Sequence, residues 1–93
     1  LRLTLAQCYP NPFNPTTRIE FETPQAGRVQ LVIFNVKGEV VARVVDELLP
    51  AGRHTATWDG RTTAGRPAAS GVYFYRLAMA RAPSLTRKMV LLR

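Results

Sequence analysis

The sequence has few of the residues that metal sites use. Its 93 residues include one cysteine, Cys8, and one histidine, His54. A single cysteine cannot form an internal disulfide, so the fold has to be held together by packing. Cys8 and His54 have no partners at the spacing of zinc ligands, and no cluster of oxygen ligands suggests calcium. We therefore expect no metal and no cofactor.

Catalytic residues are equally scarce, because the chain has only two aspartates besides this histidine and cysteine. A nucleophile or general base needs a neighbour that orients it. His54 and Asp59 are five positions apart and would point to opposite faces of one strand, which argues against a dyad. Asp59-Gly60 is more typical of a β-turn that an aspartate side chain closes. We expect His54 to be a packed, hydrogen-bonded residue and the domain not to be an enzyme.

Long apolar runs are also lacking. No stretch is long enough to cross a membrane, and the first residues show no signal peptide. With 46% hydrophobic residues, the chain fits one domain with a modest core. It begins at Leu1 rather than at a methionine, so we interpret it as a piece of a longer protein.

Acidic residues are absent from the last third of the chain. Residues 1–59 hold six basic and six acidic side chains, so the formal charge of +7 comes from residues 60–93. The basic residues there are Arg61, Arg66, Arg76, Arg81, Arg87, Lys88 and Arg93. This excess predicts a positive potential that attracts an anionic surface, although a simply solvated basic surface would look the same. Nucleic acid is not an expected partner, because Tyr73 and Tyr75 would face away from Arg76 and fill the core.

Proline is concentrated near the start, in Tyr9-Pro10-Asn11-Pro12-Phe13-Asn14-Pro15. Each proline fixes φ, removes an N–H donor and pushes the residue before it toward an extended conformation. This segment cannot be a helix or a central strand. It predicts a stiff, extended arm with asparagine-stabilised turns, which Phe13 docks onto the folded domain.

The rest of the chain is dominated by alternating apolar and polar residues, the pattern of half-buried strands. Strands are expected at Thr16–Thr23, Arg28–Val36, Glu39–Glu47, 54–58, Val72–Met79 and Leu85–Leu92, with a seventh at Leu3–Ala6. Arg28–Val36 is apolar on both faces, including Val32, Phe34 and Val36, and should be central. No segment keeps a helical apolar period over three turns, so we expect little or no helix.

This series of strands predicts an all-β fold, an antiparallel immunoglobulin-like β-sandwich of about seven strands, with a barrel as the alternative. Within Ser70–Tyr75, Tyr73 is the candidate for a tyrosine corner, in which the hydroxyl bonds back to the backbone. Trp58 and Phe74 are the aromatic residues that a sugar-binding surface would use, but we expect both to lie in the core.

Six blocks, in order, carry a resemblance to a known family. They are 9–17 (YPNPFNPTT), 29–38 (VQLVIFNVKG), 51–54 (AGRH), 58–60 (WDG), 69–77 (ASGVYFYRL) and 86–93 (TRKMVLLR). Together they resemble the type A C-terminal sorting domain of the type IX secretion system over residues 9–93, with 1–8 as a linker end or first strand. The pattern is also similar to the immunoglobulin-like domain of the flagellar hook-capping protein.

The resemblance implies a detachable address that sends an attached upstream cargo domain through the periplasm to the outer cell surface or the extracellular space. Its partners would be an outer-membrane translocon, a sortase-like peptidase and anionic lipopolysaccharide. The recognition residues would be Thr86, Arg87, Lys88, Met89, Val90, Leu91, Leu92 and Arg93. Structural motif residues would be Pro10, Asn11, Pro12, Phe13, Asn14, Pro15, Trp58, Asp59, Gly60, Gly71 and Tyr73. Two alternatives stay open: an accessory carbohydrate-binding module of a secreted polysaccharide hydrolase, and a hook-capping-like assembly domain.

Overall fold

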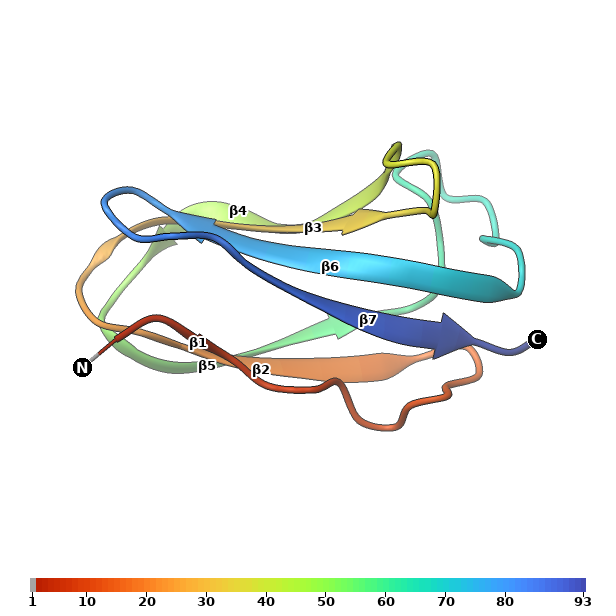
Figure 1. The fold of residues 1–93 in the computed structure, drawn as a ribbon, viewed down its shortest axis with the longest axis horizontal. Coiled ribbons are helices and arrows are strands. Elements are labelled where there is room, and N and C mark those ends of the chain that lie inside the picture. The colour runs from red at the N-terminus through yellow and green to blue at the C-terminus, as the bar shows by residue number, and fades with distance from the viewer. Residues whose placement is uncertain (1) are drawn as a thin grey trace.

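The computed structural model describes residues 2–93, and over this range the chain forms seven antiparallel strands (Figure 1). The strands are β1 (Thr4–Leu5), β2 (Thr17–Thr23), β3 (Gly27–Phe34), β4 (Val40–Leu49), β5 (Gly52–Trp58), β6 (Gly71–Met79) and β7 (Leu85–Leu91). All seven predicted strands are confirmed, with bounds that differ by a few residues. Over these 92 positions no helix is present, and so none that could span a membrane.

The strands form two separate sheets that stack as two layers (Figure 1). One sheet has the order β1-β2-β5 and the other the order β4-β3-β6-β7. The predicted antiparallel β-sandwich is therefore confirmed, and the barrel alternative is wrong because each sheet ends in two edge strands. β3 is central, as its apolar character predicted, since it pairs with β4 on one side and β6 on the other.

The core follows the alternation of the strands. Ile19 and Phe21 of β2 face Tyr73, Tyr75 and other inward side chains of β6 across the gap between the layers, and all of them are buried. Each of these positions lies two residues from the next, which is the repeat that puts side chains on one face of a strand. The sequence pattern thus predicted the inward faces of both strands correctly.

The prediction for Val36 was wrong, because this side chain is 69% exposed and lies beyond the end of β3. The side chain of Asn35 explains the early end of the strand. Its Oδ1 accepts hydrogen bonds from the backbone N–H groups of Lys37 and Glu39, both at 3.0 Å. These bonds close the turn around Val36 before it can pair in the sheet.

The proline-rich segment is bent rather than extended, which corrects the prediction of an extended arm. Bends occupy positions 10–12 and 14–15, and the peptide bonds before Pro10, Pro12 and Pro15 are cis. The physical reason for the bent path is that the segment bonds to both sheets. Tyr9 exchanges backbone hydrogen bonds with Arg18 of β2, and four residues later Phe13 bonds to the strand β7 of the other sheet.

Candidate functional site

The strand β7, which carries the predicted recognition residues, has its outer edge covered by the proline-rich segment. The N–H of Phe13 donates to the carbonyl of Val90 at 3.0 Å, and the N–H of Leu92 donates to the carbonyl of Phe13 at 2.9 Å. Phe13 and Leu91 form a parallel bridge through this pair. The proline motif and the C-terminal strand, at opposite ends of the sequence, therefore form one site.

Side chains complete the cover of this edge. The amide nitrogen of Gln7 donates to the carbonyl of Lys88 at 2.8 Å, and Asn11 Oδ1 accepts the N–H of Val90 at 2.9 Å. Arg87 Nε donates to the carbonyl of Leu5 at 2.6 Å. An uncovered edge strand is a template for pairing with other chains. The contacts of Gln7 and Asn11 occupy backbone groups of β7 that would otherwise be available to another strand, and the Arg87 side chain ties β7 to Leu5 of β1.

Beneath this edge lies a row of aromatic rings. Phe13 is 2% exposed, and its ring centroid lies 5.7 Å from that of Trp58, which in turn lies 5.5 Å from Tyr73 in an edge-on arrangement. The hydroxyl of Tyr73 donates to the carbonyl of Ala69 at 2.7 Å, which is the predicted tyrosine corner. The docking of Phe13 was thus predicted correctly, and its seat is Trp58.

The Trp58-Asp59-Gly60 motif closes the same end of the domain. Asp59 Oδ1 accepts the N–H of Arg61 at 3.0 Å, the turn expected from the sequence. The guanidinium of Arg93 donates to the carbonyls of Gly60 and Ala68. Gly60 has φ of 74°, and a Cβ there would lie 2.8 Å from the carbonyl oxygen of Pro15. Glycine is therefore required both by its backbone conformation and by the close approach of the proline motif.

Tyr75 holds the start of the chain against β6, a role that the sequence did not indicate. Its buried hydroxyl donates to the carbonyl of Ala6 at 2.8 Å and accepts the N–H of Cys8 at 2.9 Å. Burial raises the pKa of Tyr75 to about 12, because the ionised form would lose its water. The hydrogen-bond partners of Gln7, Arg87 and Tyr75 lie more than sixty positions away in the sequence, and no local motif indicates such a partner.

The predicted recognition residues divide into two groups in the folded domain. Met89 and Leu91 are fully buried. Val90 is half-buried, and the exposed members are Thr86, Arg87, Lys88, Leu92 and Arg93. Alternation explains the burial of Met89 and Leu91, which point into the sandwich, but not the exposure of Arg87, which lies on the same face of β7 two residues before Met89. A partner that meets the folded domain would contact the second group, while the first fixes the strand.

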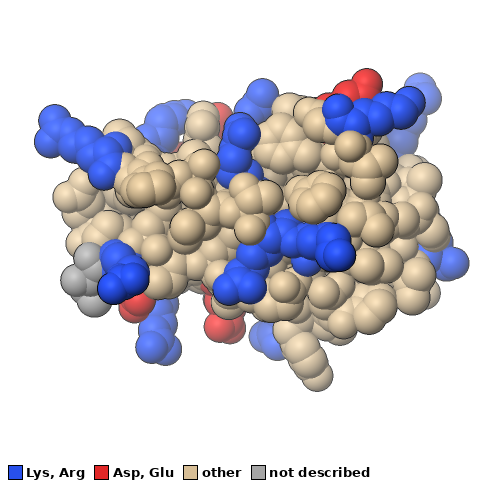
Figure 2. Space-filling model, viewed as in Figure 1, with Lys and Arg blue, Asp and Glu red and all other residues tan. Residues whose placement is uncertain are grey.

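Basic side chains gather on the face that β7 presents in Figure 1, and acidic ones are seen only toward its margins (Figure 2). Over residues 2–93, ion pairs are found only at Arg28–Asp46 and Arg53–Glu22. None involves the seven basic residues of positions 60–93. The predicted excess of positive charge is therefore not cancelled by acidic neighbours within the domain.

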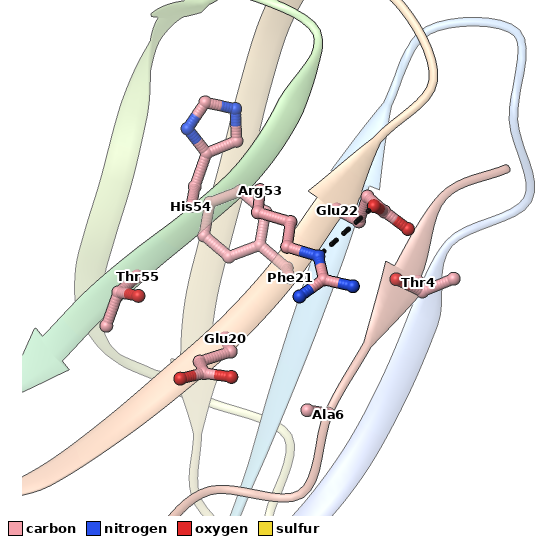
Figure 3. A pocket seen from close by; sticks show the side chains of 8 residues that line it. All are labelled: Thr4, Ala6, Glu20, Phe21, Glu22, Arg53, His54 and Thr55. Carbon is pink, nitrogen blue, oxygen red and sulfur yellow. Dashed lines mark ion pairs between the residues drawn. The ribbon is translucent and has the colours of Figure 1, made fainter. Parts of the chain in front are cut away.

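A polar hollow of about 420 Å³ lies on the outer face of the three-stranded sheet (Figure 3). Arg53 reaches Glu22 there at 3.6 Å, with Glu20 beside them on β2. His54 Nε2 lies 2.8 Å from the carbonyl oxygen of Pro50 and 3.4 Å from Thr23 Oγ1. His54 is thus the packed, hydrogen-bonded residue that was expected, and its recorded partners include no carboxylate. No group of three or more His, Cys, Asp or Glu residues that could hold a metal is found within 2–93.

The two aromatic residues considered for sugar binding differ in position. Trp58 is 3% exposed and donates its indole N–H to the carbonyl of Arg61 at 2.9 Å, so its assignment to the core is confirmed. The assignment of Phe74 to the core is wrong, because this residue lies half-buried on the outer face of the four-stranded sheet. The reason is register: Tyr73 and Tyr75 point inward, so the residue between them points outward.

Comparison with known proteins gives one family, and the similar solved structures include PorU and PorZ. The model of the FlgD Ig-like domain matches residues 9–82. The crystal structure of dimeric latent PorU from Porphyromonas gingivalis is similar with a TM-score of 0.77 at 16% identity, over 99% of this chain. PorZ, described as an essential surface component of the type IX secretion system of the same bacterium, is similar with a TM-score of 0.61 at 21% identity, over 98% of this chain.

The chain spans only about a tenth of the two solved proteins, 10% of PorU and 11% of PorZ. No curated protein sequence gives a match. At these identities the two structures show that the fold is shared, and the family match covers most of the chain.

Proposed function

Since the chain belongs to the FlgD Ig-like domain family, we propose that it is a non-catalytic sorting and anchoring module of the type A C-terminal class of the type IX secretion system. In this proposal it is covalently joined to an upstream cargo domain and directs it through the periplasm to the outer cell surface or the extracellular space. Its partners are an outer-membrane translocon, a sortase-like peptidase and anionic lipopolysaccharide.

The observation that carries the proposal is that the blocks of the resemblance meet in space. Phe13 bonds to β7, Phe13 packs on Trp58, and Gly60 accepts from Arg93. Motifs scattered over more than eighty residues thus build one edge of one sandwich. The likeness to a segment of PorZ, itself described as a type IX secretion component, is a further support.

The proposed recognition surface consists of the exposed side chains of β7, which lie on both faces of the strand, and of the residues after it. Lys88 and Arg87 supply charge, and Leu92, which is 52% exposed, supplies an apolar side chain. The cations of this surface suit lipopolysaccharide phosphates or an acidic translocon face. The buried Met89 and Leu91 act indirectly in this proposal, because their packing in the core fixes the position of β7 in the sheet.

The direct test is charge reversal in the full-length protein that carries the domain. Arg87→Glu with Lys88→Glu should reduce the fraction of protein at the cell surface and leave it in the periplasm. Lys37→Glu is the matched control, because Lys37 is an exposed cation in the turn after β3, outside the proposed surface. The melting temperature of each purified variant checks folding. Normal surface display of the double variant would contradict the proposed role of these two cations.

Deletion of Thr86–Arg93 tests the proposal at a coarser level. It removes Met89 and Leu91 from the core, so it should abolish both folding of the module and export. Continued delivery of the deleted protein to the cell surface would refute the sorting function altogether.

A second candidate is an assembly domain like that of the hook-capping relative, which the family match favours. It predicts that the module caps or joins a polymeric partner. The two candidates can be distinguished by the location of an otherwise intact cargo protein that lacks residues 9–93. Retention inside the cell supports sorting, whereas normal export with loss of assembly supports the second candidate. The carbohydrate-binding alternative loses its best platform because Trp58 is buried.

A further inference from the structure

The outer face of the four-stranded sheet carries two neighbouring rows of side chains that contain no acid. The strand registers place Val40, Phe34, Phe74 and Lys88 opposite one another in the first row. The second row is Arg43, Val32, Arg76 and Thr86. We call these eight residues the apolar–basic face. Side chains directly opposite on paired strands lie within contact distance, so each row is a continuous strip.

A hollow of about 360 Å³ opens at one end of this face. Phe34, Phe74 and Val36 supply its apolar walls, with Arg76 and Thr86 as polar groups beside them. The guanidinium carbon of Arg76 lies 4.6 Å from the centroid of the Phe34 ring, a cation–π arrangement that holds the cation over the hollow.

The cations of the face have no carboxylate partner in the part of the chain that the structure describes, since neither of its ion pairs includes Arg43, Arg76 or Lys88. The acid nearest in sequence, Glu39, accepts a hydrogen bond from the amide of Asn35 at 2.8 Å. In the next row of the same face, where Asp46 lies opposite Gln30, the Asp46 carboxylate is engaged by Arg28 at 3.0 Å. An acidic side chain from outside would therefore meet three cations without a carboxylate partner, while the two bordering acids are engaged by Asn35 and Arg28.

We propose that the apolar–basic face is a docking surface for a partner protein, and that the hollow takes an apolar side chain of an acidic segment whose carboxylate pairs with Arg76. Interfaces commonly combine a buried apolar anchor with charge complementarity around it. A sugar is less well matched, because Arg76 covers the Phe34 ring and Phe74 is then a single aromatic wall beside the aliphatic Val36. A flat lipid surface does not fill a hollow. The face lies outside the cargo junction and largely outside residues 86–93, so this proposal does not depend on the sorting function.

The test is binding of a defined probe to the 93-residue chain, followed by nuclear magnetic resonance. The probe is a capped hexapeptide that alternates glutamate with phenylalanine or valine, and its matched control has glutamine in place of glutamate. We expect shifts at Phe34, Phe74 and Thr86 with the acidic peptide, and weak or no shifts with the glutamine peptide. Arg76→Met should lower the affinity for the acidic peptide by about threefold to tenfold, because a single charge-assisted contact is lost.

Two further variants make the result specific. Val36→Glu places a repelling charge on the hollow at an exposed turn position and should weaken binding without unfolding the domain. Arg53→Met is the matched control, because Arg53 is an exposed arginine on the outer face of the other sheet, and it should bind as the parent does. Equal binding of the two peptides, shifts confined to other surfaces, or equal effects of Arg76→Met and Arg53→Met would overturn the proposal. If polygalacturonate or phosphatidylglycerol vesicles bind more tightly than the acidic peptide and shift the same residues, the proposal that the partner is a protein would be overturned.

Discussion

Truncation of Phe13 to alanine tests whether the proline-rich segment is an integral part of the fold. Phe13 is 2% exposed and packs on Trp58, so Phe13→Ala should leave a cavity that backbone bonds on both sides prevent from collapsing. Buried phenylalanine-to-alanine changes cost about 3–5 kcal/mol of unfolding free energy. A domain of this length has about 5–14 kcal/mol in all, so one side chain accounts for about a fifth or more of its stability.

Urea unfolding followed by tryptophan fluorescence measures this loss, because Trp58 is the only tryptophan and lies against Phe13. The midpoint should fall with an unchanged slope, and the melting temperature should fall by about 12 °C or more. Tyr9→Ala is the control: Tyr9 belongs to the same segment but is 71% exposed, and its removal should change stability by less than about 0.5 kcal/mol. A loss below about 1 kcal/mol for Phe13→Ala would show that the segment does not depend on this seat.

Three other variants test contacts of the proline-rich segment and of the residues before it. Gly60→Ala should destabilise by about 1–3 kcal/mol, because its Cβ would meet backbone at 2.8 Å, whereas Gly38→Ala, with open space around it, should cost less in the same urea assay. Tyr75→Phe should cost about 1–3 kcal/mol by leaving the buried N–H of Cys8 and the partly buried carbonyl of Ala6 without this partner. Folding raises the pKa of Tyr75 from 10.0 to about 12. The contribution of the neutral hydroxyl to the free energy of unfolding is therefore complete below pH 10.0 and is lost between pH 10.0 and pH 12. This alkaline loss of stability should be smaller in Tyr75→Phe. Asn11→Ala should speed hydrogen exchange of the Val90 amide, and an unchanged rate would show that this contact is not formed in solution.

Local pattern was enough to predict the strands and the inward faces of the sheets. The alternation around Tyr73 and Tyr75 has only one arrangement that buries both rings, and the turn residues limit where each strand can end. Val36 shows where this reasoning fails. Its apolar side chain extended the pattern of β3 by two residues, but the hydrogen bonds of Asn35 determined the end of the strand.

The candidate site was predicted only in part. Phe13 could be recognised as a docking residue because it is one of two large apolar side chains in a segment that can be neither a helix nor a central strand. That its backbone pairs with the C-terminal strand could not be predicted, because the contact joins residues 13 and 91 and depends on how the two sheets stack. Phe74 was misplaced for a different reason: its aromatic character suggested the core, although its position between the inward-facing Tyr73 and Tyr75 puts it on the outer face.

The parallel bridge between Phe13 and β7 also has a mechanical meaning. The two ends of the domain lie at opposite ends of its 36 Å long axis, and the covering segment runs alongside β7 in the same direction (Figure 1). A pull on the two ends would slide these neighbours past each other, so the hydrogen bonds at Val90 and Leu92 would be loaded together rather than opened one by one. A module that is held at one end and pulled at the other would thus be loaded in shear, the direction in which these hydrogen bonds resist separation most strongly.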